Sequence, residues 1–210
     1  VPGRPAAALQ TALRGSDRVL DVGELGGRLF LNLAGIGLDA AVAARFNARQ
    51  GGRRGVWPYL VLGVRELLRY RALDYRVRVD GEPLATRALA LVWANGREYG
   101  GGARIAPAAV PDDGAADLVV VGDRSLGARL WDAHRLFTGT LAAAPGVWTR
   151  RCRMLEIEAG EPIRFHVDGE PVEGAARLTG RLHPGALRVR VPSRRAAVVT
   201  VTPRPPGPAP

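Results

Sequence analysis

Hydrophobic and polar residues alternate with a period of two in several short segments of the chain. The clearest is Leu73–Val79, in which Tyr75, Val77 and Val79 are separated by charged residues. Such alternation places successive side chains on opposite faces of a strand, so it predicts a sheet with one buried face. Ala88–Ala94 is apolar at every position, which predicts a strand buried on both faces. Further strands are predicted at Arg18–Val22, Arg28–Ala34, Asp117–Val121, Arg151–Glu158, Ile163–Val167, Ala176–Leu182 and Ala186–Val191.

Helical spacing replaces this alternation in a few places. Helices are predicted at Ala6–Arg14, at Leu38–Ala48 and after Ser125, which can cap a helix. The strongest apolar stripe is formed by Trp57, Leu60, Val61, Val64, Leu67 and Leu68. We interpret this stripe as a face packed on the core, and a lipid-facing surface is the alternative.

These elements together predict the fold class. Strands separated by Gly and Pro turns, with about three helices, indicate a mainly β domain of the α+β class, built as a sandwich or an open barrel. The segment Thr202–Pro210 holds five prolines in nine residues and predicts a disordered tail.

Composition adds limits to this picture. The 210 residues are enough for one large domain that buries about 70% of its unfolded surface. The longest apolar run is too short to span a bilayer, and no apolar signal-peptide segment follows Val1. The single cysteine, Cys152, excludes a disulfide framework and is compatible with a reducing cytosol.

The basic charge suggests a partner. All 30 basic residues are arginines, and the formal net charge is +10. The codon bias of a GC-rich genome would explain this, as would attraction to an anionic partner. Because the arginines are scattered and no nucleic-acid-binding motif is present, we expect an anionic membrane surface and not nucleic acid.

One segment combines a glycine run with an acidic turn. Gly100–Gly102 has no Cβ atoms, so a phosphate or another backbone can approach it closely. The turn Pro111–Gly114 follows. The carboxylate of Asp113, with the carbonyl groups of Val110 and Ala115, would suit Mg²⁺ or Ca²⁺. An Asp-Gly turn without metal is the alternative.

The pentapeptide Val-Asp-Gly-Glu-Pro occurs twice, at Val79–Pro83 and Val167–Pro171. The first copy is interpreted as a hairpin turn. In the second copy, His166, Asp168 and Glu170 would share one face if the strand continued. Two such carboxylates can divide the work, one accepting a hydroxyl proton and the other orienting a metal-bound nucleotide. We interpret His166 as a hydrogen-bonded structural residue and not as the base.

Five segments of the sequence form a set: Phe30–Ala40, Ala94–Gly102, Ile105–Pro107, Pro111–Gly114 and His166–Glu170. In this order and spacing they resemble the diacylglycerol kinase/sphingosine kinase-like lipid kinases, particularly their bacterial members. The resemblance implies a two-domain kinase, with a nucleotide-binding α/β domain that carries a Gly-Gly-Asp-Gly-Thr loop and a β-rich, sandwich-like domain that supplies the lipid pocket.

The resemblance also implies roles for individual residues. Asp168 resembles the general base for the lipid hydroxyl, and Glu170 would assist on the side of the nucleotide and its metal. Asp39 would face the lipid headgroup. Asp113, with the carbonyl groups of Val110 and Ala115, resembles a structural Mg²⁺ site. The implied cofactors are ATP and Mg²⁺, and the implied substrate is diacylglycerol or a sphingoid-type lipid.

The Gly-Gly-Asp-Gly-Thr loop is absent from the sequence. We therefore expect residues 1–24 to be a remnant of the nucleotide-binding domain or a linker. Residues 25–192 would form the β-rich lipid-binding domain, and residues 193–210 a return segment and the Pro-rich tail. We expect this polypeptide to be inactive alone, cytoplasmic, and peripherally associated with the inner face of the membrane. A non-catalytic lipid-binding or membrane-docking module is the alternative, and a homodimer stays open.

Overall fold

The computed structural model describes residues 5–48, 56–99 and 102–193, with side chains omitted for residues 56–60. In these residues, eleven strands form one sheet in the order β10-β9-β3-β5-β4-β8-β11-β1-β2, with β6 beside β5 and β7 beside β6. This arrangement confirms the mainly β fold class. The strands are β1 (Ser16–Leu25), β2 (Arg28–Phe30), β3 (Leu33–Gly37), β4 (Leu73–Val79), β5 (Glu82–Ala94), β6 (Ala116–Gly122), β7 (Val147–Cys152), β8 (Met154–Ala159), β9 (Arg164–Val167), β10 (Glu170–Glu173) and β11 (Arg177–Val191).

The core follows the two predicted burial patterns. In β4, Tyr75, Val77 and Val79 are buried and the residues between them are exposed. All residues of β5 from Ala88 to Ala94 are buried, because both faces of this half of the strand are covered. Leu91 and Trp93 belong to one apolar cluster, and Val92 and Ala94 belong to a second. Trp93 packs edge-on against Phe30, with ring centroids 5.6 Å apart.

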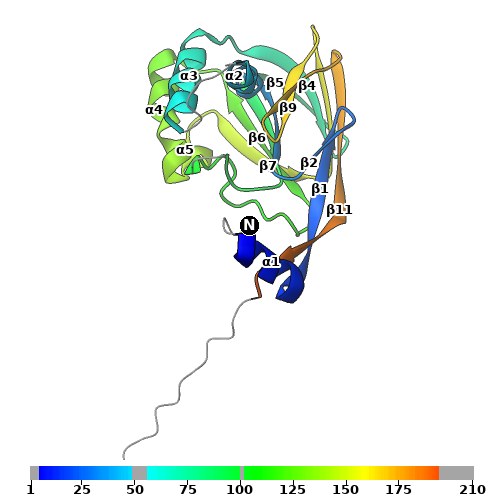
Figure 1. The fold of residues 1–210 in the computed structure, drawn as a ribbon. Helices are drawn as coiled ribbons and strands as arrows, with labels where there is room; N and C mark the ends of the chain where they lie inside the picture. The colour runs from blue at the N-terminus through cyan, green and yellow to red at the C-terminus, as the bar shows by residue number, and fades with distance from the viewer. Residues whose placement is uncertain (1–4, 49–55, 100–101, 194–210) are drawn as a thin grey trace, which may run out of the picture. The chain divides into compact units, whose positions relative to one another are not determined.

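Figure 1 shows helices α2, α3, α4 and α5 gathered on one side of the sheet. They are α2 (Leu38–Asn47), α3 (Val56–Arg69), α4 (Leu126–Ala133) and α5 (Arg135–Thr138), with a short 3₁₀ turn, η2 (Leu141–Ala143), after them. Helix α1 (Pro5–Arg14) lies near the start of the chain. No helix in the described ranges is long and apolar enough to cross a bilayer.

The interpretation of the α3 stripe as a core face is wrong for the side chains that the structure describes. Val61 is 61% exposed and Leu68 is 47% exposed. Among the described side chains of α3, Glu66 is the buried one, and its carboxylate pairs with the guanidinium of Arg45 on α2 at 2.9 Å. Val64 and Leu67 of the stripe line a cavity, so the described part of the stripe is divided between this cavity and the exposed surface.

Two predicted strands are interrupted and two others are joined. The segment Arg28–Ala34 divides into β2 and β3 at residues 31–32, and the segment Arg151–Glu158 divides into β7 and β8 at Arg153. The two strands predicted after Ala176 are one continuous strand, β11. Both interruptions lie where side chains from hairpin turns bind the backbone.

The chain divides into two compact units, one spanning Val19–Leu187 and one formed by Val1–Arg18 with Arg188–Pro210. In the second unit, the Arg190 guanidinium contacts the Asp17 carboxylate at 2.8 Å, and the Ser193 hydroxyl donates to the Arg14 carbonyl. The predicted disordered tail lies outside the described residues. The candidate site belongs entirely to the first unit.

Candidate functional site

The Asp168 turn connects β9 to β10. Val167 pairs with Glu170 across it, and Asp168 and Gly169 have φ values of 48° and 90°. A turn with two positive φ values suits a two-residue hairpin. The strand therefore does not continue through Asp168, and the expectation that His166, Asp168 and Glu170 share one strand face is wrong.

The Asp168 carboxylate binds the backbone where β2 ends and β3 begins. Its Oδ2 accepts the N–H of Leu31 at 2.8 Å, and its Oδ1 accepts the N–H groups of Asn32 and Leu33 at 2.9 Å each. The Asp168 N–H donates to the Leu33 carbonyl at 2.9 Å. These bonds explain the break in the predicted strand, because N–H groups that a ladder would use are bound by a side chain.

The first pentapeptide forms a similar turn elsewhere in the sheet. Asp80 and Gly81 have φ values of 50° and 88°, and Val79 pairs with Glu82. Asp80 Oδ1 accepts the N–H groups of Arg153 and Met154 at 2.9 and 2.8 Å, where β7 gives way to β8. Both copies thus use the Asp carboxylate to hold an interrupted strand.

The second copy differs through His166, which begins a buried hydrogen-bonded cluster. His166 Nε2 lies 2.9 Å from Asp39 Oδ2, and the Tyr99 hydroxyl donates to the same oxygen at 2.8 Å. His166 Nδ1 accepts the Gly169 N–H at 3.2 Å. The cluster joins the start of α2, the segment after β5 and the Asp168 turn, three parts far apart in sequence.

Gly35 on β3 leaves space for this cluster. A Cβ atom at position 35 would lie 1.9 Å from Asp39 Oδ2 and 2.4 Å from His166 Nε2. Real Cβ atoms do not approach other atoms so closely. Gly35 therefore admits a carboxylate and an imidazole against the strand.

Burial and charge act in opposite directions on His166. Burial alone lowers its pKa, but the charge and hydrogen bond of Asp39, with the charge of Asp168, raise the pKa above the ordinary histidine value. A neutral ring can accept the Gly169 N–H at Nδ1 while it donates through Nε2. A protonated ring would lose the Gly169 bond and form an ion pair with Asp39.

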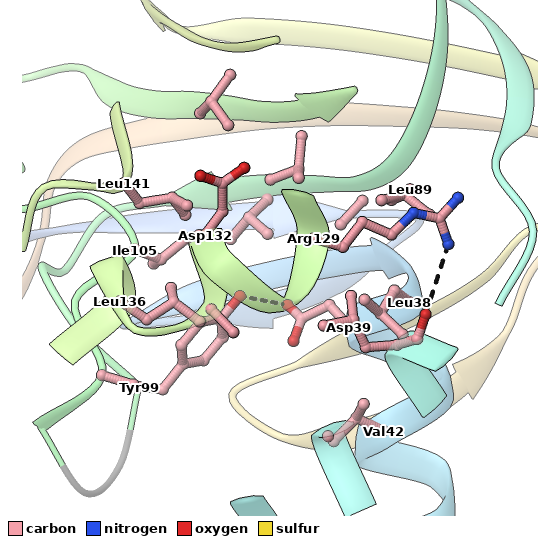
Figure 2. Close-up of a pocket in the computed structure, with 18 of the residues that line it drawn as sticks. Leu38, Asp39, Val42, Leu89, Tyr99, Ile105, Arg129, Asp132, Leu136 and Leu141 are labelled. Atoms are coloured by element: carbon pink, nitrogen blue, oxygen red, sulfur yellow. Dashed lines mark hydrogen bonds between the residues drawn. The ribbon is translucent and has the colours of Figure 1, made fainter. Parts of the chain in front are cut away.

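A cavity of about 210 Å³ opens beside this cluster. Its walls are mostly apolar, and Figure 2 shows Asp39 and Tyr99 meeting at its edge. On its other side Asp132 is paired with Arg124 at 2.5 Å. An apolar cavity with a few fixed polar groups is the usual form of a small-molecule site. The labelled apolar lining residues are Leu38, Val42, Leu89, Ile105, Leu136 and Leu141.

Of the predicted site residues, only Asp39 lines this cavity. Asp168 is connected to the cavity only through its neighbour, because the Gly169 N–H donates to His166 and His166 contacts Asp39. Glu170 is exposed on β10. The interpretation of His166 as a hydrogen-bonded residue is confirmed, but sequence reasoning missed Tyr99 and the pairing of His166 with Asp39. The available signal was a tyrosine inside the glycine-rich segment, which could not be paired with a residue 60 positions away.

The acidic turn is held by a residue that the sequence did not single out. Asp21 is buried, and its two carboxylate oxygens accept the N–H groups of Gly114 at 2.7 Å and Gly185 at 2.8 Å. Its own N–H donates to the Pro111 carbonyl at 2.8 Å. The shape of the turn therefore comes from protein hydrogen bonds.

Asp113 is itself engaged by a positive side chain. The Arg151 guanidinium contacts its Oδ2 at 2.7 Å, and the Ala115 N–H donates to its Oδ1 at 3.2 Å. Burial raises the pKa of the adjacent Asp117, with Arg151 opposing and Asp113 adding to the rise. A guanidinium at this distance repels a divalent cation, so Asp113 with the carbonyl groups of Val110 and Ala115 does not fit Mg²⁺ as arranged. No cluster of three or more His, Cys, Asp or Glu side chains suited to a metal occurs in the described ranges.

Comparison with known proteins places the chain in a family. Residues 32–191 match the family described as the YegS C-terminal NAD kinase beta sandwich-like domain. The chain belongs to this family. The match contains the Asp168 turn, the buried cluster and the cavity, and it confirms the resemblance to bacterial lipid kinases.

The named relatives are longer than this chain. It is 34% identical over 194 residues to a Pseudomonas fluorescens protein named "probable lipid kinase YegS-like", and 33% identical over 201 residues to a Pseudomonas aeruginosa protein of the same name. These matches cover 91% and 92% of the chain but 63% of each relative. The fold is similar to a diacylglycerol kinase-like protein from Bacillus anthracis, with a TM-score of 0.71, 19% identity, and coverage of 90% of this chain and 62% of that one.

Proposed function

We propose that this chain is the lipid-binding portion of an ATP-dependent lipid kinase that phosphorylates a hydroxyl group of diacylglycerol or a sphingoid-type lipid. The observation that carries the proposal is the apolar cavity whose polar edge is formed by Asp39 and Tyr99. Its volume, about 210 Å³, is below the ~300 Å³ at which common ligand pockets begin, which favours one hydrocarbon chain over two. In this proposal, Asp39 faces the lipid headgroup.

Asp168 is the proposed general base. Its Oδ1 already accepts two N–H groups, whereas Oδ2 accepts one and keeps an acceptor position for a hydroxyl proton. Held by three backbone donors, the carboxylate is fixed in place, and fixed position is a large part of what catalysis of phosphoryl transfer requires. Glu170 follows in the same hairpin, exposed on β10, and would assist on the nucleotide side.

ATP would be the phosphoryl donor, and Mg²⁺ would be the metal ion that binds with it. No residue of this chain is assigned to ATP, and the Asp113 turn is not assigned to Mg²⁺ because Arg151 occupies it. In this proposal nucleotide binding belongs to the part of the relatives that the chain does not span, so the polypeptide by itself does not turn over ATP.

The proposed surface partner is the anionic inner face of the cytoplasmic membrane. Apolar side chains near the cavity are exposed on α4 and α5, among them Trp131 at 69% and Phe137 at 43%. Arg65 and Arg69 are exposed on α3. Apolar side chains beside arginines favour the interface of an anionic bilayer.

A second candidate is a non-catalytic lipid-binding or membrane-docking module. It is favoured by the similarity of the two Asp turns, since Asp80 holds backbone in the same way and is not part of the lining of the cavity beside Asp39. In such a module, Asp168 would have only the structural role that Asp80 has.

A chimera distinguishes the two candidates. The N-terminal portion of the Pseudomonas aeruginosa relative is joined to this chain, and lipid-dependent ATP turnover is measured. We expect turnover that Asp168→Asn abolishes and Asp80→Asn preserves, with the folding of each variant checked by circular dichroism. Full turnover in a folded Asp168→Asn variant would remove Asp168 from the role of base. Lipid binding without turnover in any chimera would favour the second candidate.

A further inference from the structure

The Asp39 carboxylate has one oxygen committed to the protein and one available to the cavity. Oδ2 receives the Tyr99 hydroxyl and His166 Nε2. Within the part of the chain that the structure describes, no group donates to Oδ1. The side chain is 9% exposed and belongs to the cavity lining. A carboxylate oxygen that faces a cavity and accepts no hydrogen bond from the protein can accept one from a donor on a ligand.

Asp39 Oδ2 is connected to the Asp168 turn through His166. One ring nitrogen of His166 contacts Oδ2, and the other accepts the Gly169 N–H. The Gly169 N–H can donate only to an unprotonated Nδ1, which assigns the remaining proton to Nε2 and directs it at Asp39. The imidazole is 2% exposed, so water does not compete for either bond.

The elements around His166 leave it little freedom to move. Gly35 lies against the ring and the carboxylate at distances that exclude a Cβ atom. On the other side of the turn, Asp168 is fixed by the N–H groups of Leu31, Asn32 and Leu33. A change at Asp39 therefore acts on the hydrogen bonds and not on the packing.

We propose that Asp39, His166 and the Gly169 N–H form a relay that reports the headgroup in the cavity to the Asp168 turn. The proposal rests on the proposed function of the cavity. A ligand hydroxyl that donates to Oδ1 draws negative charge away from Oδ2. The hydrogen bond from His166 Nε2 to Oδ2 then weakens. The ring is polarised less, and its Nδ1 becomes a weaker acceptor for the Gly169 N–H. Tyr99 and His166 are positioning residues in this scheme, since they act through Asp39.

The relay also defines the chemical class of the headgroup. Asp39 offers an acceptor, so the fitting ligand is an apolar chain with a hydroxyl donor. A carboxylate at the same place would face the Asp39 charge in a buried setting, where like charges repel strongly.

The test uses the 210-residue chain and two probes that share a hydrocarbon chain, octanol and octanoate. Amide NMR spectra are recorded over a pH series that ends above the folded-state pKa of His166, which lies above the ordinary histidine value, so that the ring is neutral at the upper end. We expect octanol to shift the Gly169 amide resonance and to change its hydrogen exchange by about fivefold. Octanoate is expected to bind about tenfold more weakly or not at all.

The His166→Phe variant removes both ring nitrogens. We expect it still to bind octanol, with an affinity changed by the loss of the His166 bond to Asp39, while the Gly169 resonance no longer responds. His183→Phe is the matched control, because His183 pairs with Glu24 at 2.8 Å at a separate position and lies outside the relay. That variant should keep the Gly169 response.

Tyr99→Phe provides a milder variant in case His166→Phe does not fold. It leaves His166 as the only protein donor to Oδ2, so the saturating Gly169 shift should increase. Octanol binding that leaves Gly169 unaffected in the wild type overturns the relay, as does a Gly169 response that persists in folded His166→Phe. Absence of octanol binding to the wild-type cavity would instead overturn the proposed function on which the relay rests.

Discussion

Asp80 and Asp168 occupy equivalent positions in two hairpin turns, and each carboxylate holds the backbone at an interruption of a neighbouring strand. They differ in how many oxygens they use. Asp80 accepts both of its N–H groups with Oδ1, whereas Asp168 uses both oxygens. Asp168 therefore needs both carboxylate oxygens to hold the neighbouring strand, whereas Asp80 needs only Oδ1.

Substitution by asparagine should therefore affect the two turns unequally. Asparagine tolerates positive φ and keeps one oxygen, so Asp80→Asn should cost about 0.5–1 kcal/mol of unfolding free energy. In Asp168→Asn the new amide must face one of the backbone N–H groups, so we expect a cost of about 2 kcal/mol. Urea denaturation of both variants measures the difference. Equal losses would mean that the second oxygen of Asp168 contributes nothing.

Membrane binding should depend on the exposed apolar residues of α4. Trp131→Ala removes a large side chain from the proposed interface and should weaken co-sedimentation with anionic vesicles about tenfold. Met154 is 55% exposed on β8, away from the helices, and Met154→Ala is the matched control. Added salt should weaken vesicle binding of both variants, because it screens the attraction between arginines and lipid phosphates. Similar losses for the two variants would disprove a localised docking face.

The Asp39–His166 pair should contribute stability that depends on pH. Its partners Asp39 and Asp168 raise the folded-state pKa of His166. The contribution is therefore complete below the unfolded value, about 6.5, and is lost as pH rises through the higher folded-state value. The Tm difference between the wild type and His166→Gln should be about 3 °C larger at about pH 5.5 than at about pH 8.5. In an Asp39→Asn background, burial lowers the His166 pKa without opposition from Asp39, so the Tm difference should no longer be larger at the lower pH. In the wild-type background, a Tm difference that grew with pH would contradict the account.

Removal of divalent cations should leave the fold unchanged. Since Arg151 supplies the positive charge at Asp113, the Tm of the chain should agree within about 1 °C in EDTA and in excess Mg²⁺. Arg151→Gln removes the competing charge and should make the Tm rise with Mg²⁺ concentration. A clear Mg²⁺ response in the wild type would restore the metal interpretation of the acidic turn.

The strands of the core were predictable because their patterns are local. Alternation in β4 and the apolar run in β5 needed only neighbouring residues, and both strands occur as expected. The α3 stripe shows the limit of the same reasoning. Periodicity identifies an apolar face but not what covers it, and here Glu66 is buried while Val61 is exposed.

The candidate site depended on pairs distant in sequence. Asp39 lies 127 positions from His166, and Leu31 lies 137 positions from Asp168. No spacing rule relates such residues. The resemblance to a family selected Asp39 and Asp168, but it gave no reason to join them through His166 and Gly169. The interruption of the predicted strand at Leu31 also follows from a distant carboxylate and not from local propensity.

Lipid binding in the cavity is the central claim, and two glycines allow a direct test. Gly63 on α3 lines the cavity, whereas Gly127 on α4 does not, and both have open space where a Cβ would lie. Binding of a short-chain monoacylglycerol to Gly63→Phe and Gly127→Phe is measured by calorimetry. We expect Gly63→Phe to weaken binding at least about tenfold, because the ring fills the cavity, and Gly127→Phe to bind as the wild type does. Equal affinity in all three proteins would show that the lipid does not occupy this cavity.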